Sequence, residues 1–182
     1  MNENRFVCLL RGINVGGNNI IKMADLKNSF LKMGFKNPGS YIQSGNILFN
    51  SDEVSVNKIT QKIEKKLSKD FSYQAAVVVF SKKDFIEIIK KAPKDFGKAP
   101  EKFRYDVLFF MEGEKPEKYF SSIEVKEGVD ESYLGKRAVY FQRLIEKASQ
   151  SKLNKLASSP VYKLLTIRNW NTCLKLYSLV QE

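Results

Sequence analysis

The stretch most informative about the fold is Arg11-Gly12-Ile13-Asn14-Val15-Gly16-Gly17-Asn18-Asn19, which joins an apolar run to a helix-like segment. Residues 6–10, just before it, are all apolar, a pattern typical of a central strand covered on both faces. Beyond it, apolar residues recur at helical spacing from Met23 to Met33, which predicts an amphipathic helix. A turn rich in glycine and asparagine therefore leads from the first strand into the first helix.

The next segments extend this start into a recognisable order of elements. Residues 41–49 read as a hairpin around Ser44-Gly45. A single kinked strand is the alternative, because Ser-Gly is a weaker hairpin signal than Asn-Gly. A second amphipathic helix follows over residues 56–67, with Ser55 as its N-cap, and residues 75–80 form another apolar strand. The order βαββαβ predicts a ferredoxin-like unit.

The remainder of the chain predicts a second α+β half. The charged loop 94–104 is the best boundary, so we expect a ferredoxin-like half over residues 1–93 and a second half with C-terminal helices over 94–182. We expect the two halves to pack together as one integrated domain. In the second half the pattern indicates strands at 105–111, 123–125, 133–134 and 138–141, and a last helix capped by Thr166.

Composition excludes several kinds of chemistry. The 182 residues include no histidine, which removes histidine-based catalysis, proton transfer and metal ligation. No Cys-x-x-Cys pair is present, and the motif stretches hold no carboxylate, so no metal and no cofactor are expected. The net charge is +11, and residues 136–182 hold nine Lys or Arg against two Glu. Such a segment is compatible with an anionic partner such as nucleic acid, but a solvated basic surface is the simpler explanation.

The chain has the features of a cytoplasmic protein. It contains no apolar run long enough to span a membrane and no leader-like N-terminus. Cys8 and Cys173 lie within apolar runs. We therefore expect reduced core thiols without a disulfide.

A candidate site follows from the predicted sheet. The end of the first strand and the hairpin turn lie at one edge of a ferredoxin-like sheet, beside the start of the first helix, whose free N–H groups favour an anion. The candidate ligand-binding side chains at this edge come from the two motif stretches: Arg11, Asn14, Asn18, Gln43, Ser44 and Asn46. The alternative is that the glycines and asparagines only build turns. The loop has neither GxGxxG spacing nor a P-loop ending.

Three motifs together also carry a resemblance. Residues 10–17 (LRGINVGG), 41–46 (YIQSGN) and 166–172 (TIRNWNT) occur in this order and span nearly the whole chain. They resemble the bacterial family catalogued as domain of unknown function 1697. The resemblance implies an α+β protein with a ferredoxin-like part and brings no activity with it. Within the third motif, Arg168 is a further candidate ligand contact.

Three hypotheses of function remain open at this point. The first is a protein that binds a small phosphate- or carboxylate-bearing ligand at the Gly/Asn-rich loop. The second is an enzyme that works without histidine and uses the same loop as an anion cradle. The third is a protein- or nucleic-acid-interaction domain whose basic C-terminal segment, with Lys152, Lys155 and Lys163, makes the contact. The sequence does not decide the oligomeric state.

Overall fold

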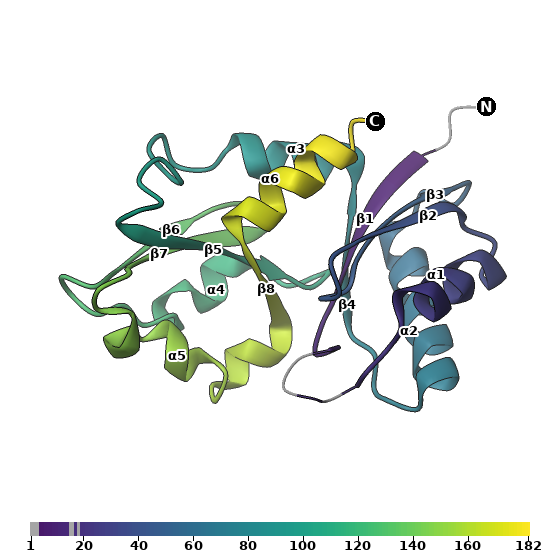
Figure 1. The fold of residues 1–182 in the computed structure, drawn as a ribbon, viewed down its shortest axis with the longest axis horizontal. Helices are drawn as coiled ribbons and strands as arrows, with labels where there is room; N and C mark the ends of the chain where they lie inside the picture. Colours follow the sequence, from purple (N-terminus) through teal and green to yellow (C-terminus); the bar gives the residue numbers. More distant parts are fainter. Residues whose placement is uncertain (1–3, 15–16, 18) are drawn as a thin grey trace. The chain divides into compact units, whose positions relative to one another are not determined.

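The computed structural model describes residues 4–14, 17 and 19–182, and its chain is α+β, as predicted (Figure 1). The chain divides into two compact units: residues up to Ile86 together with Leu176–Glu182, and residues Glu87–Lys175. Each unit holds a four-stranded antiparallel sheet. Within the described residues, no helix has the length and apolar character needed to cross a membrane.

The first unit has the predicted ferredoxin-like arrangement. Its elements are β1 (Asn4–Leu10), α1 (Met23–Lys32), β2 (Lys36–Tyr41), β3 (Asn46–Ser51), α2 (Val56–Phe71), β4 (Val77–Ser81) and the start of α3 (Lys82–Lys90). The strand order is β2-β3-β1-β4, so β1 is central, as its all-apolar sequence indicates. Tyr41 lies opposite Asn46 across a hairpin, which excludes a single kinked strand.

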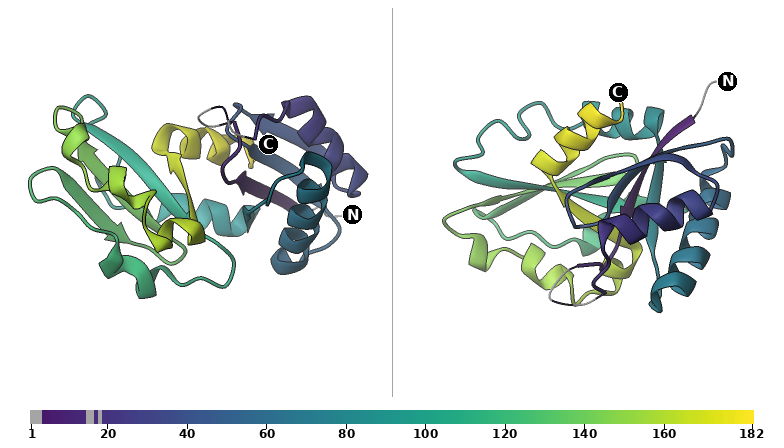
Figure 2. Two further views of the ribbon diagram at one scale, coloured as in Figure 1. Left: turned by 90° about the horizontal axis from the view of Figure 1, so that it is seen from below. Right: turned by 45° about the vertical axis from the view of Figure 1, so that its right-hand side comes forward.

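The helices α1 and α2 cover one face of this sheet (Figure 1). Both views in Figure 2 place them against the same strands. Alternate residues of β1, namely Phe6, Cys8 and Leu10, are buried in the cluster that these helices complete. Ser55 caps α2 by accepting a hydrogen bond from Lys58 N, as predicted.

The position predicted for the second strand was wrong. The sequence suggested a hairpin whose first strand begins at Tyr41, whereas β2 spans Lys36–Tyr41 and contains Pro38 and Gly39. Because β2 is the edge strand, the missing N–H of Pro38 removes no ladder bond from the interior of the sheet. A register shift between Lys36 and Gly39 accommodates the pair as a bulge.

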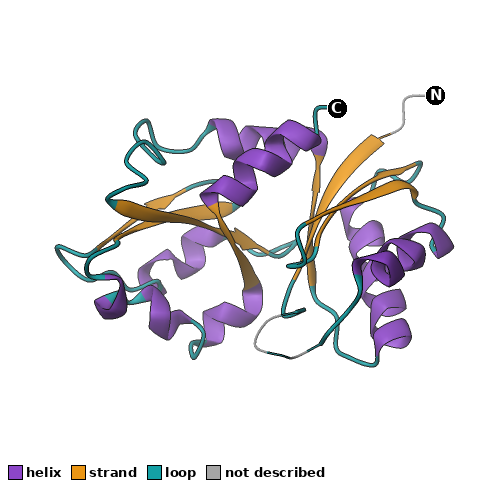
Figure 3. Ribbon diagram, viewed as in Figure 1, coloured by secondary structure: helices purple, strands orange, loops and turns teal. Residues whose placement is uncertain are grey.

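The second unit repeats the topology of the first. Its elements are the remainder of α3, β5 (Phe103–Phe110), α4 (Pro116–Tyr119), β6 (Asp130–Leu134), β7 (Ala138–Leu144), α5 (Leu153–Leu156), β8 (Leu165–Asn169) and the start of α6 (Trp170–Leu179), with 3₁₀ turns at Phe120–Ser122, Ala148–Gln150 and Pro160–Leu164. The strand order is β6-β7-β5-β8. Reading β5, β6, β7 and β8 as the counterparts of β1, β2, β3 and β4 gives the same order in both sheets. In Figure 3 the helices α4 and α5 of this unit are much shorter than α1 and α2.

Two predictions for the second half were wrong. Residues 123–125 form no strand; the chain there leaves a 3₁₀ turn instead. Thr166 does not cap a helix, because residues 165–169 form β8 and α6 begins at Trp170. Asn169 starts the helix instead, since its Oδ1 accepts a hydrogen bond from Asn171 N at 3.0 Å. The expectation that the two halves form one integrated domain divided near residue 93 stays a prediction.

Candidate functional site

Backbone hydrogen bonds bring the end of β1 and the hairpin turn together in the first unit. Leu10 N donates to Gly45 O at 2.8 Å, and Arg11 N donates to Ala76 O at 3.0 Å. The side chain of Asn14 extends the connection by donating to Gln43 O at 2.8 Å. The two motif stretches therefore meet at one edge of the sheet, which we call the motif edge: residues 11–14 and 42–46.

Gly45 is required by this close approach. Its φ is +76°, and a Cβ atom there would lie 2.7 Å from Leu10 Cβ and 2.8 Å from Ile13 Cδ1. Any larger residue would be strained and would clash with two buried side chains. The glycine of the Ser-Gly pair is thus explained by packing between the two motifs.

Asn14 and Asn46 hold the motif edge in shape. Asn14 adopts a left-handed backbone with φ of 52°, and its amide also bonds both polar groups of the Ile21 backbone at 2.8 and 3.0 Å. Asn46 is fully buried and donates to Tyr41 O and Ser44 Oγ, each at 3.0 Å. Both asparagines therefore serve the turns, the role that the sequence offered as the alternative to ligand binding.

The remaining candidates at this edge differ in exposure. Arg11 is half-buried and directly follows β1, Ser44 is half-buried, and Gln43 is exposed. Asn18 lies outside the described residues. Next to Gln43, Ile42 is 49% exposed and has φ of +50°, an unusual conformation for a β-branched residue. Sequence patterns do not predict this strained isoleucine, because Gly, Asn and Asp are the residues expected at such turn positions.

Arg168 belongs to the second unit. It lies in β8, is 8% exposed, and its Nη1 donates to Thr166 Oγ1 at 2.8 Å and to Ile167 O at 2.9 Å. The sequence placed it just before or within the first turn of a helix. Arg168 lies in β8, two residues before α6 begins at Trp170, so it precedes the helix and is not part of its first turn. Its guanidinium braces the third motif locally through these bonds.

The second unit has an edge equivalent to the motif edge. Phe110 N donates to Arg137 O at 3.2 Å, and Met111 N donates to Leu164 O at 2.9 Å. These bonds match those of Leu10 and Arg11 in the first unit, so Met111 is the counterpart of Arg11. Beside Met111, Glu112 forms an ion pair with Arg137 at 2.8 Å. The two units thus share the same backbone hydrogen bonds at this edge, but the side chain after the central strand is arginine in the first unit and methionine in the second.

The carboxyl with a raised pKa in the first unit is Glu64, on α2. Partial burial raises its pKa, and Oε1 accepts a hydrogen bond from Val77 N at 3.1 Å. Val77 is the first residue of β4, next to the Ala76 carbonyl that receives the Arg11 N–H. Glu64 therefore anchors the start of β4 to α2.

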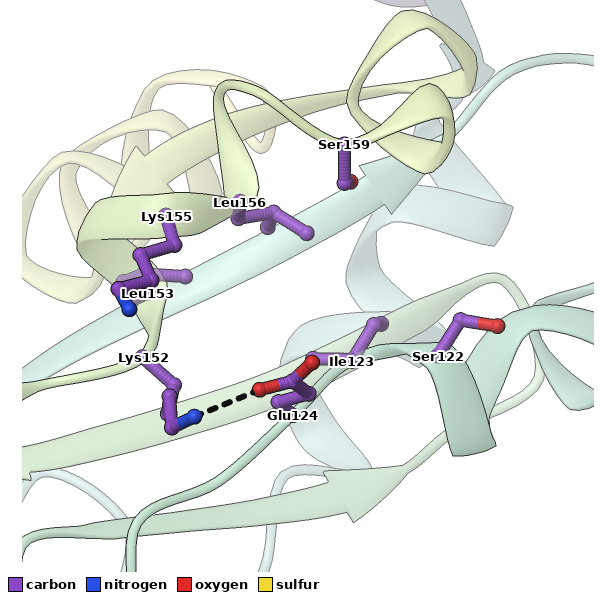
Figure 4. Close-up of a pocket in the computed structure, with 8 residues that line it drawn as sticks. All are labelled: Ser122, Ile123, Glu124, Lys152, Leu153, Lys155, Leu156 and Ser159. Atoms are coloured by element: carbon purple, nitrogen blue, oxygen red, sulfur yellow. Dashed lines mark hydrogen bonds and ion pairs between the residues drawn. The ribbon is translucent and has the colours of Figure 1, made fainter.

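A small cavity of about 70 Å³ lies in the second unit and is lined in part by the basic C-terminal segment (Figure 4). Lys152 and Lys155 line it, and Figure 4 shows the Lys152 ammonium directed at the carboxylate of Glu124, 2.8 Å away. This bond lowers the pKa of Glu124. One of the cations expected to meet nucleic acid therefore already has an anionic partner, and binding by this segment stays a prediction.

The two cysteines are free, buried thiols, as predicted. Burial raises the pKa of Cys173 far above its ordinary value, which makes that thiol a poor nucleophile. Within the part of the chain that the structure describes, no three acidic or cysteine side chains gather to form a metal-binding group.

Comparison with known proteins agrees with this fold and with the motifs. The family model described as "Protein of unknown function (DUF1697)" matches residues 3–140. The chain belongs to the DUF1697 family. A solved structure, "The structure of conserved bacterial protein SP0830 from Streptococcus pneumoniae", is similar over 99% of both chains, with 28% sequence identity and a TM-score of 0.87. No curated protein matches the chain. The DUF1697 resemblance that the three motifs suggested is thus confirmed.

Proposed function

We propose that the motif edge binds a small organic anion with a phosphate or carboxylate group, and that Arg11 supplies the positive charge. The observation that carries this proposal is the pair of equivalent edges. Arg11 and Met111 follow the central strand of their sheets and make the same backbone bond to the neighbouring strand. Since the second unit builds this position with an uncharged methionine, the fold itself does not require an arginine.

The charge around the motif edge supports an anionic ligand. The two motif stretches, residues 11–19 and 41–49, contain Arg11 and no acidic residue. The equivalent edge of the second unit carries Glu112 and Glu114 beside Met111, and the first of these is paired with Arg137. An excess of one sign of charge raises the local concentration of the opposite ion. The first edge is therefore suited to an anion and the second is not.

The residues divide into a frame and a contact set. Asn14, Asn46 and Gly45 fix the shape of the loop and the hairpin, as their bonds and close contacts show. Arg11 and the exposed Gln43 are then placed to meet the ligand. Gly12, directly after Arg11, has a left-handed backbone with φ of +68°, a conformation that can direct a backbone N–H group toward an anion. The exposed side chain of Ile42 offers an apolar contact for the organic part.

A thermal-shift screen tests this function. The panel contains inorganic phosphate, nucleoside monophosphates, sugar phosphates and dicarboxylic acids, each matched in ionic strength with chloride. A ligand that binds the native state at concentration L stabilises it by RT ln(1 + L/Kd), so the melting temperature rises with the ligand concentration. Arg11→Leu is expected to remove the shift, whereas Arg11→Lys keeps part of it because the charge remains.

The matched control is Arg104→Leu, the same change at an exposed arginine of β5. It is expected to leave the ligand-induced shift unchanged. The proposal is wrong if no member of the panel stabilises the wild type more than chloride does, or if Arg11→Leu retains the full shift. Should Arg11→Leu fail to fold, Gln43→Ala at the exposed end of the edge provides the second variant.

A further inference from the structure

The face of the second sheet that points away from α4 and α5 is rich in aromatic side chains. Residues in register across a sheet share a face, and alternate residues of a strand do as well. Tyr105 pairs with Gln142, Gln142 with Glu131, and Tyr133 with Tyr140. This aromatic face therefore carries the following side chains of β5, β6 and β7: Phe103, Tyr105, Glu131, Tyr133, Tyr140 and Gln142. The intervening residues Leu108, Phe110, Val139 and Phe141 pack toward α4 and α5.

One end of the aromatic face is closed. Phe96 packs edge-on against Tyr105 and Tyr140, with ring centroids 4.9 and 5.5 Å apart, and against Trp170 at 5.1 Å. Gly97 permits this arrangement, because a Cβ atom there would lie 2.3 Å from Trp170 Nε1. Tyr140 is also fixed by a hydrogen bond from its hydroxyl to Ile88 O at 2.6 Å. These rings form a structural core.

The other end of the aromatic face is open and forms a groove of about 430 Å³. We call it the aromatic groove; its lining includes Phe103, Tyr105, Tyr133, Gln142, Lys94 and Lys98. Phe103 and Tyr133 are only half-buried, so their rings are accessible. The Tyr133 ring is held in place, because its hydroxyl donates to Glu131, which also receives Gln142 Nε2 at 3.1 Å. The bond to Glu131 raises the pKa of Tyr133 to about 12, so the ring stays uncharged at neutral pH.

The rim of the aromatic groove is positively charged. The groove lining contains Lys94, Lys98 and the acid Asp95, and the same loop continues through Glu101 and Lys102. Asp95 is paired with Lys98 at 3.0 Å, which leaves Lys94 and Lys102 as exposed cations of the same loop. Lys102 Nζ lies 5.2 Å from the centre of the Phe103 ring. Aromatic rings are thus combined with cations at one opening.

We propose that the aromatic groove binds single-stranded nucleic acid, with a base stacked on Phe103 or Tyr133 and the phosphates near the rim lysines. Base stacking on accessible aromatic rings, together with a cationic path for the backbone, is how proteins hold single strands without strict sequence preference. RNA-recognition modules use the same sheet topology and place their stacking aromatics on the sheet face. Here the accessible rings come from β5 and β6, next to β7.

The first sheet offers no comparable surface. The residues of β1 on both faces are apolar and buried, including Val7 and Leu9. The inference therefore concerns the second unit, and it is independent of the anion site proposed at the motif edge. If the experiments reject one of the two proposals, the other is unaffected, because the two tests use different residues, probes and variants.

Fluorescence anisotropy with a labelled oligouridylate of about 12 nucleotides tests the proposal at low salt. The wild type is expected to bind, and Phe103→Leu and Tyr133→Leu are each expected to weaken binding roughly tenfold, because leucine keeps apolar volume but cannot stack as a ring does. Lys94→Glu is expected to weaken binding and to reduce its salt dependence. Tyr177→Leu, at a half-buried tyrosine of α6 in the first unit, is the matched control and should change nothing.

Competitors separate the possible sources of binding. Unlabelled oligouridylate should displace the probe far better than inorganic polyphosphate, which has charge but no bases, and better than uridine monophosphate. Equal displacement by polyphosphate together with unchanged binding by Phe103→Leu would mean charge attraction alone and would overturn the proposal. If uridine monophosphate binds as tightly as oligouridylate, the groove recognises a single nucleotide and the proposal of a single-strand site is wrong. Absence of binding at low salt would also end it. If Phe103→Leu does not fold, Tyr133→Leu and Lys94→Glu carry the test.

Discussion

The hairpins of the two sheets occupy the same place in the same topology but are closed by different means. In the first unit, Asn46 begins β3 and is buried, and its amide bonds the turn through Tyr41 O and Ser44 Oγ. In the second unit the counterpart is Ala138, which begins β7, and the turn is closed by Gly135 N donating to Ala138 O at 2.9 Å. A backbone bond is thus sufficient for this hairpin. The buried amide of the first unit shapes a turn beyond what the topology demands.

A substitution at Asn46 gives the largest stability effect expected from this comparison. Asn46→Ala removes the bonds from a fully buried amide to Tyr41 O and Ser44 Oγ, which should lower the free energy of unfolding by about 2 kcal/mol. The reciprocal change, Ala138→Asn, introduces an amide at a position that is 1% exposed and should also destabilise the protein. Urea unfolding followed by circular dichroism measures both.

The proposed difference between the two hairpins is wrong if either Asn46→Ala or Ala138→Asn fails to destabilise the protein. A loss below about 0.5 kcal/mol for Asn46→Ala would mean that its bonds are replaced by water and that the amide does not shape the turn. A neutral Ala138→Asn would show that the second hairpin can accept the same closure.

The connections to the last strands of the two sheets also differ, and this gives a smaller, pH-dependent effect. In the first unit the long helix α2 reaches β4 through Glu64 and Val77 N, whereas β8 directly follows a 3₁₀ turn. Burial raises the pKa of Glu64 above 4.5, so the native state binds the proton more tightly than the unfolded state. The carboxyl therefore favours folding at low pH, and this contribution is lost as the pH rises from 4.5 through the raised pKa.

Glu64→Gln keeps the acceptor oxygen for Val77 N and removes the charge. We expect it to match the wild type in stability well below pH 4.5 and to be slightly more stable at neutral pH. Thermal melts at a series of pH values provide the measurement. A variant that is less stable than the wild type at neutral pH would show that the charge strengthens the bond to Val77 more than burial penalises it.

The contrast between the two units also explains what could be read from the sequence. In the first unit the helices α1 and α2 are long enough for apolar periodicity to appear, so the βαββαβ order was predicted correctly. In the second unit α4 and α5 each span one turn, too short for periodicity, and β8 was mistaken for a helix start. The repeated topology was therefore visible only in the structure.

The candidate site was predicted in part. The meeting of residues 11–14 with 42–46 follows from strand pairing, and the structure places them together. The division of labour among them could not be read from the sequence, because asparagine suits both a turn and a ligand contact. The aromatic groove was missed because its rings come from β5 and β6, which are distant in sequence and share a face only through the register with β7.

The most direct test of the anion site is a titration of isotope-labelled protein with inorganic phosphate, followed through the backbone amide signals in NMR spectra. If Arg11 and the surrounding turns bind the anion, the largest shifts fall on residues 11–14 and 42–46, they saturate together, and they disappear in Arg11→Leu. Shifts that concentrate around Lys152 and Lys155, or that spread evenly over the surface lysines without saturating, would contradict the account.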